Sequence, residues 1–461
     1  MKAKRILACG LLALAASSAA SAATKYVITT TGTWGTAQDG AVLKAGGTVE
    51  YSNKGSGIAV ARSSSTTFLS AIRAAGYNAA ADMTVQWQKP ILEPSLMPQI
   101  TLTSNAVTAG DETFAPLQWN LTAVHAQQAW NAGYDGSGVR VAIVDTGIWD
   151  QQVDIAPNLD VAHSKSFVPG FNFNQDVGTF WHGTHVAGIV AAADNGIGTI
   201  GIAPGATLIG VKVLHNGSGS FSQVIEGILY AATPIGEGGA GADIINMSLG
   251  ALFPRGGGNT GAGQLVAAMG RAVNYATSRN VLVVSAAGND GVDLDHSLSY
   301  ISVPAQSGSG IAVAATAPIG WAVGYPNGAT NFNHPASYTN YGSSAIWVAA
   351  PGGDFLYYYT NPTQVCAVPG NNGFGNVYQY CYVFDYVFSS IRGSGGSTTS
   401  YAWAAGTSMA APAASAVAAL IKQRFPGISV SDLKTKLAQS AVGKGPYYGK
   451  GFVNAYNAVT Q

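Results

Sequence analysis

The chain has 461 residues, and only 10% of them are charged, whereas a typical soluble protein has about 25%. The 22 basic and 22 acidic side chains give a formal net charge of zero, which argues against nucleic acid as a partner because phosphate neutralisation requires clustered Lys and Arg. Hydrophobic residues make up 47% of the chain, so the composition also excludes general disorder.

A signal peptide is predicted for residues 1–22. Basic residues precede an apolar run at 6–16, and the small residues of 20–22 provide a cleavage site. The run is too short to cross a bilayer, which takes roughly 20 residues, and no other segment is long enough. We therefore expect a secreted, extracellular protein with no membrane span.

A small α/β unit is expected between residues 26 and 98, followed by a polar linker at 101–111. Its helix begins at Ser65 and ends at Gly76, with apolar residues on one face. Strands are expected at 26–30, 47–51, 57–61 and 83–87.

From about residue 117 onward, short apolar strands alternate with helices. Continuous apolar runs are typical of strands that are covered on both faces. The strands are expected at 139–144, 208–213, 244–247 and 281–284, with helices at 222–230 and 264–279. This alternation predicts an α/β fold with a mostly parallel central sheet and helices on both of its faces.

Two cysteines, Cys366 and Cys381, lie outside the signal peptide. In an exported chain, the simplest expectation for two cysteines at this spacing is a disulfide. Two buried thiols are the alternative, and a metal site is disfavoured because no histidine lies near either residue.

Three motifs contain the residue types that nucleophilic catalysis needs. Asp145 follows a buried strand in the segment VDTG, although a lone Asp there would equally cap the next turn. His182 opens an Ala-rich helix in the segment HGTHVAG, which does not have the spacing of an H-E-x-x-H zinc site, and His185 is expected to be a buried structural residue. Ser408 begins a second small-residue helix in GTSMAAP, where taken alone it would be an N-cap.

Together the motifs supply a carboxylate, an imidazole and a hydroxyl. A serine hydroxyl is a weak nucleophile until a base takes its proton, and a carboxylate holds the imidazole of that base in the required tautomer. An esterase of the α/β-hydrolase type is disfavoured by the chain order Asp, His, Ser and by the absence of G-x-S-x-G around Ser408. The motifs resemble those of secreted subtilisin-like serine proteases (subtilases, peptidase family S8), from about residue 117 to the C-terminus.

The resemblance implies a subtilisin-like α/β fold preceded by a ferredoxin-like propeptide domain. The implied division is a signal peptide at 1–22, a propeptide at 23–110 that acts as chaperone and inhibitor and is removed, and a catalytic domain at 111–461. An insertion at 353–403 carries both cysteines and would either edge the substrate cleft or form a surface loop. The implied function is that of a monomeric endopeptidase with protein and peptide substrates. A catalytically silent binding module would lack a triad or oxyanion residue, and none is missing.

The resemblance also assigns roles to individual residues. Asp145, His182 and Ser408 would form the catalytic triad, and Asn289 would donate its side-chain amide to the oxyanion together with the Ser408 N–H. Substrate would contact two backbone segments, an apolar subsite and a first specificity pocket, a set that comprises Ser248, Leu249, Gly250, Gly217, Ser218, Gly219, Phe221, Val224 and Gly288.

The chemistry implied by the resemblance requires no cofactor. A structural calcium ion stays open, because some members of the family bind one. Asp154 and Asn195 match two of the ligand positions, but the glutamine expected at the N-terminal ligand position is absent.

Overall fold

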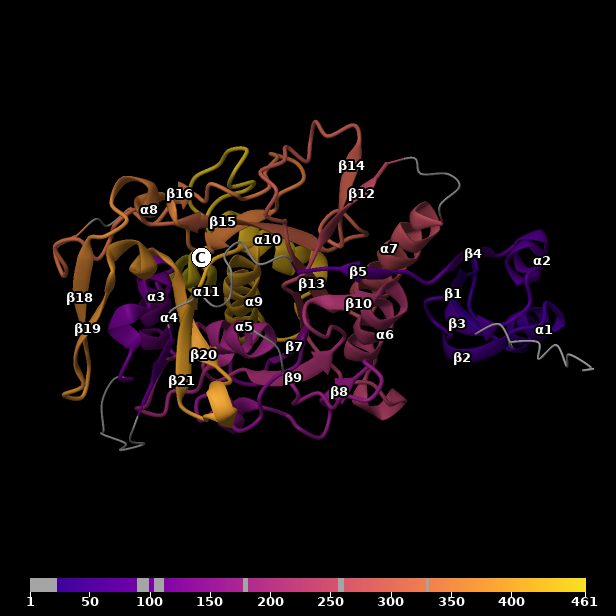
Figure 1. Cartoon of the computed structure of the whole chain (residues 1–461), viewed down its shortest axis with the longest axis horizontal. Helices are drawn as coiled ribbons and strands as arrows, with labels where there is room; N and C mark the ends of the chain where they lie inside the picture. The colour runs from indigo at the N-terminus through magenta and orange to yellow at the C-terminus, as the bar shows by residue number, and fades with distance from the viewer. Residues whose placement is uncertain (1–22, 89–98, 103–111, 177–180, 256–260, 329–330) are drawn as a thin grey trace, which may run out of the picture.

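The computed structural model describes residues 23–88, 99–102, 112–176, 181–255, 261–328 and 331–461 (Figure 1). The predicted signal peptide and most of the predicted linker lie outside these residues. Within the described ranges, no helix combines the length and the apolar character needed to cross a membrane.

The N-terminal part of the described chain is a small domain at one side of a larger body (Figure 1). Its four strands form an antiparallel sheet in the order β2-β3-β1-β4, and its helices give the β-α-β-β-α-β order of a ferredoxin-like fold. Its elements are β1 (Thr24–Thr29), α1 (Thr36–Lys44), β2 (Thr48–Asn53), β3 (Ile58–Ser63), α2 (Phe68–Ala74) and β4 (Asn78–Ala81).

The strand predicted at 83–87 does not join this sheet. It is β5 (Thr84–Gln86), which leaves the small domain and pairs antiparallel with β10 (Ser218–Ser220) of the body. Its place at the sheet edge is taken by β4, whose sequence NAAA lacks the β-branched residues that signal a strand. The sequence also gives no signal for α1, in which Val42 is the one buried residue.

The body is built on an eight-stranded sheet in which β16-β15-β13-β11-β7-β9-β8 are neighbours and β17 also pairs with β15. All these pairings are parallel except that of β16, which confirms the predicted sheet. Its strands are β7 (Arg140–Asp145), β8 (Lys165–Ser166), β9 (Thr207–Lys212), β11 (Ile244–Met247), β13 (Leu282–Ala286), β15 (Ile311–Ala317), β16 (His334–Pro335) and β17 (Val348–Pro351).

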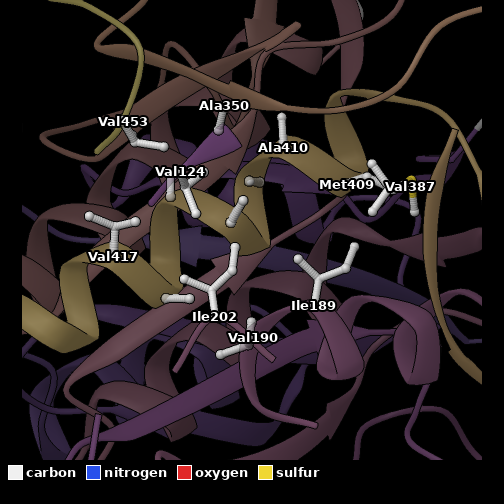
Figure 2. Close-up of a cluster of buried hydrophobic side chains, with 14 of the residues drawn as sticks. Val124, Ile189, Val190, Ile202, Ala350, Val387, Met409, Ala410, Val417 and Val453 are labelled. Atoms are coloured by element: carbon white, nitrogen blue, oxygen red, sulfur yellow. The ribbon is translucent and has the colours of Figure 1, made fainter. Parts of the chain in front are cut away.

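Helices cover both faces of this sheet. Along β7, Val141 and Ile143 point into the cluster formed with α5 and α9, whereas Ala142 and Val144 point into the cluster formed with α6 and α7. Figure 2 shows the first of these clusters around the Ala-rich helix α9. The helices are α3 (Trp119–Ala123), α4 (Ala126–Asn131), α5 (His182–Ala191), α6 (Phe221–Ala232), α7 (Ala262–Ser278), α9 (Thr407–Arg424), α10 (Val430–Ser440) and α11 (Ala455–Thr460).

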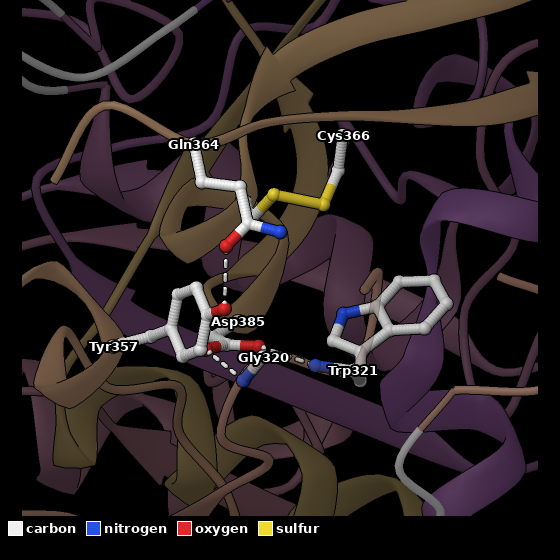
Figure 3. Close-up of a disulfide and its surroundings, with 7 residues drawn as sticks. Gly320, Trp321, Tyr357, Gln364, Cys366 and Asp385 are labelled. Carbon is white, nitrogen blue, oxygen red and sulfur yellow. Dashed lines mark hydrogen bonds between the residues drawn. A yellow bond between two sulfur atoms is a disulfide. The ribbon is translucent and has the colours of Figure 1, made fainter. Parts of the chain in front are cut away.

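The segment at 353–403 forms a separate layer beside the sheet (Figure 1). Its hairpin is closed by the Cys366–Cys381 disulfide, which confirms that prediction (Figure 3). The last strand of the segment pairs with β6 (Gln99–Thr101), so the predicted linker begins as a strand. The elements of the segment are α8 (Leu356–Thr360), β18 (Val365–Gly370), β19 (Gly375–Tyr380), the 3-10 helix η5 (Cys381–Asp385), β20 (Val387–Ile391) and β21 (Ser400–Ala404).

Candidate active site

The three residues of the predicted triad lie at the carboxyl-terminal edge of the central sheet. Asp145 ends β7, His182 begins α5, and Ser408 lies in the first turn of α9. Asp145 and His182 are both buried, and His182 Nδ1 lies 2.8 Å from Asp145 Oδ1. Ser408 and His182 line the same cavity, whose volume is about 370 Å³. The fold therefore brings a carboxylate, an imidazole and a hydroxyl together from three distant parts of the chain.

Thr146 and Asp176, to which the sequence interpretation gives no role, connect Asp145 to the helix that carries His182. The Thr146 N–H donates to Asp145 Oδ1 over 2.7 Å, and the Thr146 hydroxyl donates to Asp176 Oδ1 over 2.7 Å. Asp176 is buried, which raises its pKa, and it also accepts a bond of 2.9 Å from the Thr184 N–H in α5. Asp176 thus links the end of β7 to the helix that carries His182.

Ser408 is tied to one of the predicted substrate-binding segments. Its Oγ donates to the carbonyl oxygen of Ser248 over 3.1 Å, and the Ser248 Oγ donates to the Ser408 carbonyl oxygen over 2.7 Å. These two bonds hold the start of α9 against the segment that follows β11.

The amide of Asn289 has a defined orientation in the same cavity. Asn289 Oδ1 accepts hydrogen bonds from the Thr407 N–H (2.9 Å) and the Thr407 hydroxyl (2.8 Å). A backbone N–H can only donate, so the atom that faces Thr407 must be the oxygen, which leaves the NH₂ group for other partners. Thr407 lies in the GTSMAAP motif, but the sequence interpretation gives it no role of its own.

The predicted substrate-binding segments are paired with the chain's own residues 84–88. Strand β5 runs along Ser218 and Gly219, and the N–H groups of Trp87 and Gln88 both donate to the Gly217 carbonyl oxygen (2.9 and 3.2 Å). From the opposite side, the Gly250 N–H donates to the Trp87 carbonyl oxygen over 2.9 Å. A short length of extended chain therefore lies between the two segments, as an added β-strand does.

Trp87 fills an apolar pocket of the body. Its ring centroid lies 4.9 Å from that of Phe221 and 5.9 Å from that of Phe253, and its indole N–H donates to the Gly219 carbonyl oxygen over 2.9 Å. Phe221 is one of the two predicted walls of the apolar subsite, and Val224, the other, is buried in the same cluster. Phe253 is a third wall that the sequence does not indicate; it belongs to β12 (Ala251–Pro254), which pairs with β14 (Tyr300–Val303).

Gln88 extends from this strand to the triad. Its amide nitrogen lies 3.0 Å from Asp145 Oδ1, 2.8 Å from His182 Nδ1 and 3.1 Å from the Ser248 carbonyl oxygen. Gln88 also lines the cavity with Leu249, Gly288 and Ser408. The N-terminal domain thus reaches the candidate catalytic centre through one side chain.

The remaining contact between the small domain and the body lies on α6 and α7. Asp82 accepts hydrogen bonds from the Ser222 N–H (3.0 Å) and hydroxyl (2.6 Å) at the start of α6. Further along α6, burial raises the pKa of Glu226 to about 7, with Lys25, Asp82 and Glu50 of the small domain nearby. The carboxyl group of Glu226 is therefore largely protonated below pH 7 and about half protonated at neutral pH.

His185 has a structural role. It is fully buried, and its Nε2 lies 3.1 Å from the Ala402 carbonyl oxygen. Burial lowers the pKa of His185 to about 3, so it stays neutral. This agrees with the expectation that the second histidine of the motif supports packing.

The residues at the predicted calcium position do not fit the ion. Asp154 Oδ2 accepts hydrogen bonds from the Thr199 N–H (2.9 Å), the Thr199 hydroxyl (3.1 Å) and the Ser390 hydroxyl (3.1 Å), and burial raises the pKa of Asp154 to about 7. Asn195 Oδ1 accepts the Ile197 N–H. Ca²⁺ is held by six to eight oxygen ligands, which come from carboxylates, side-chain and backbone carbonyls and water. Here Asp154 Oδ2 faces three donors instead, and within the described ranges no group of three or more acidic, His or Cys side chains is arranged so that it could hold a metal ion.

The insertion edges the cavity. Phe355, directly before α8, lines it together with Tyr338, Met409 and Ser408. The hairpin of β18 and β19 forms a surface layer further out. One part of the segment therefore edges the cleft and another lies on the surface, so each of the two expectations describes a part of it.

Comparison with known proteins gives a consistent result. Residues 136–457 match the family model described as "Subtilase family", Peptidase_S8. The chain is 37% identical to M-protease of Shouchella clausii (strain KSM-K16) over 340 residues, which are 73% of this chain and 68% of that protein. It is 36% identical to Subtilisin Savinase of Lederbergia lenta over 73% of this chain and 96% of that protein.

A solved structure is similar over nearly the whole chain. The Epidermin Leader Peptide Processing Serine Protease of Staphylococcus aureus superposes with a TM-score of 0.69, covering 95% of this chain and 98% of that one. The two sequences are 21% identical, so this likeness concerns the fold alone.

Proposed function

Because the chain belongs to the subtilase family and is a serine-type endopeptidase, we propose that Ser408 is its nucleophile, His182 its general base and Asp145 the carboxylate that orients the base. The observation that carries this assignment is the buried 2.8 Å contact of Asp145 with His182, which lines the same cavity as Ser408. The substrates are proteins and peptides.

In the proposed reaction, His182 takes the proton of the Ser408 hydroxyl while Ser408 Oγ attacks the carbonyl carbon of the scissile peptide bond. The resulting imidazolium is stabilised by Asp145, then returns the proton to the leaving amine as the C–N bond breaks. Water, deprotonated by the same imidazole, hydrolyses the acyl-enzyme and restores Ser408. No metal ion or cofactor takes part in these steps.

Stabilisation of the negative charge on the substrate oxygen is assigned to two hydrogen-bond donors, the Asn289 NH₂ group and the Ser408 N–H. Support comes from the contact of Asn289 Oδ1 with Thr407, which turns the donor end of the amide away from Thr407. Donors fixed in advance stabilise the developing charge without reorganising during the reaction. Thr407 is then a positioning residue.

Residues 23–110 are proposed to be a removable inhibitory propeptide, exported with the enzyme after a signal peptide at 1–22. Support comes from the strand at 84–88, which occupies the two substrate-binding segments, and from Gln88, which contacts Asp145 and His182. Cleavage after this strand and release of the propeptide would free the cavity. The active form is proposed to be a secreted monomer.

A processing experiment tests this proposal. The Ser408→Ala chain should accumulate at precursor size and hydrolyse no peptide, whereas the wild-type chain should be trimmed. Addition of a trace of wild-type enzyme should trim the variant if its fold is intact. Trimming of the purified variant on its own would contradict the proposal.

A further inference from the structure

A row of aromatic rings leads from the catalytic cavity onto the surface of the insertion. Its first two rings line the cavity, and each following ring contacts the one before it. The row consists of Tyr338, Phe355, Tyr359, Tyr358, Tyr382 and Tyr380.

The ring contacts are continuous along the row. Tyr338 and Phe355 stack with centroids 6.1 Å apart, and Phe355 meets Tyr359 edge-on at 6.0 Å. Tyr359 and Tyr358 lie 5.8 Å apart, and Tyr358 and Tyr382 lie 5.1 Å apart. An extended chain advances about 3.3 Å per residue, so the five centroid-to-centroid steps of the row offer contacts to roughly nine substrate residues at most.

The row begins at a buried ring and includes exposed rings outside the cavity. Tyr338 is 7% exposed, whereas Tyr358 and Tyr359 on α8 are 46% and 70% exposed, and Tyr380 at the far end is 45% exposed. Contiguous exposed apolar surface is uncommon on soluble proteins and marks interaction sites. Tyrosine suits such a site because its ring gives contact area while its hydroxyl stays hydrated.

The row has a rigid base. Asp354 accepts hydrogen bonds from the Ser337 N–H (2.6 Å) and from the N–H of Phe355 (2.7 Å), which fixes the residue that enters the cavity. Tyr357 on α8 donates its hydroxyl to Gln364 over 2.7 Å, and the neighbouring disulfide joins β18 to η5, where Tyr382 lies (Figure 3). The base of the row is thus fixed before any ligand arrives, which lowers the entropic cost of binding.

The side of the cavity that the row extends is the side of the leaving group. Strand β5 and Trp87 occupy the opposite side, between Gly217 and Gly250, where substrate residues before the scissile bond would pair. Phe355 and Tyr338 line the cavity together with Met409 and Ser408, and α8, which follows Phe355, lies across the body from β5 and the small domain (Figure 1). Chain that continues past Ser408 therefore meets the first rings of the row.

We propose that this aromatic row binds the substrate segment that follows the scissile bond and selects proline-containing or aromatic sequences there. The inference rests on the proposed function, since it deepens the substrate preference of the same site. Planar rings without charge recognise apolar side chains, and they favour proline because its extended conformation costs little entropy to bind. The observation behind it is the continuous series of ring contacts that joins the catalytic cavity to the exposed rings of Tyr358, Tyr359 and Tyr380.

The test uses three substrates with the same residues before the scissile bond. One is a p-nitroanilide, which has no residue after that bond; the second continues with Ala, Ser and Gly, and the third with Pro, Tyr and Phe. The purified wild-type enzyme should cleave the third peptide with a kcat/KM about tenfold above that of the second. The double variant Tyr358→Ala, Tyr359→Ala should bring this ratio close to one and leave p-nitroanilide hydrolysis within a factor of two.

Tyr378→Ala provides the matched control, because Tyr378 is 64% exposed on β19 but is not part of the row. It should retain the wild-type ratio. An equal ratio in the wild type and the double variant would overturn the inference, and so would a loss of the ratio in the Tyr378→Ala control. If the wild type hydrolysed the p-nitroanilide no faster than Ser408→Ala, the proposed function itself would fail, so the two failures are distinguishable.

Discussion

Substitution of Trp87 by alanine should weaken inhibition by residues 23–88 about 100- to 4,000-fold. Trp87 is 1% exposed, its ring packs on Phe221 and Phe253, and its indole N–H is bonded to Gly219. Truncation of a buried Trp costs about 3–5 kcal/mol, and 1.4 kcal/mol corresponds to a tenfold change in binding. Because these partners all belong to the body, the cost falls on the association of the two parts.

The assay measures the inhibition constant of purified residues 23–88 added to the mature enzyme, with a fluorogenic peptide as substrate. The N-terminal domain has its own buried cluster around Ile28, Phe68 and Ile72, to which Trp87 does not belong. The variant should therefore keep the circular dichroism spectrum of the parent. Thr84→Ala, at an exposed position of the same strand, is the matched control and should change the inhibition constant less than threefold.

An inhibition constant for Trp87→Ala within threefold of the parent would refute the reasoning. It would mean that the pocket of Phe221 and Phe253 does not hold the N-terminal domain in solution. Inhibition that is not competitive with the peptide would contradict the assignment of residues 84–88 to the substrate-binding segments.

Three further outcomes are expected. Thr407→Val should lower kcat by about 10- to 100-fold with KM nearly unchanged, because only the backbone N–H then holds Asn289 Oδ1. Thr407→Ser should retain most activity, because it keeps the hydroxyl donor as well. Equal losses in both variants, measured by steady-state kinetics, would contradict this role. Inhibition by residues 23–88 should weaken at least tenfold between pH 5 and pH 8. The raised pKa of Glu226 means that the complex favours the protonated carboxyl group, and this contribution to binding is lost as the pH rises through about 7. Glu226→Gln should flatten the pH profile of the inhibition constant, and a profile unaffected by this variant would refute the explanation. Chelation with EDTA should shift the Tm by less than about 2 °C. Asp154→Asn should be much less destabilising than Asp154→Ala, because the side chain at this position accepts hydrogen bonds from Thr199 and Ser390. A rise in Tm of more than 5 °C on adding Ca²⁺ would show that the site binds the ion after all.

The sequence predicts the parallel sheet and the grouping of Asp145, His182 and Ser408 for identifiable physical reasons. Strands covered on both faces are continuous apolar runs, and catalytic residue types sit at strand ends and helix starts in long, specific motifs. These features are local, so they can be read without knowing the rest of the fold. The disulfide follows from the same kind of reasoning, since an exported chain with two cysteines leaves few alternatives.

The parts that the sequence does not predict depend on contacts between distant segments. Strand β5 has an ordinary strand pattern, but nothing local indicates that its partner is β10 rather than the sheet of its own domain. Phe253 and Asp176 become significant only when they meet Trp87 and Thr146. The aromatic row is likewise assembled from residues on four different segments. The many aromatic residues near Tyr358 in the sequence therefore do not indicate that the row runs from the catalytic cavity onto the insertion.

Labelling with a fluorophosphonate probe tests the assignment of Ser408 most directly. The mature enzyme should react, and mass spectrometry of its peptides should place the adduct on Ser408. His182→Ala should slow the labelling by several orders of magnitude, because the hydroxyl loses its base. An adduct on another residue, or labelling of Ser408→Ala as fast as that of the wild type, would contradict the assignment.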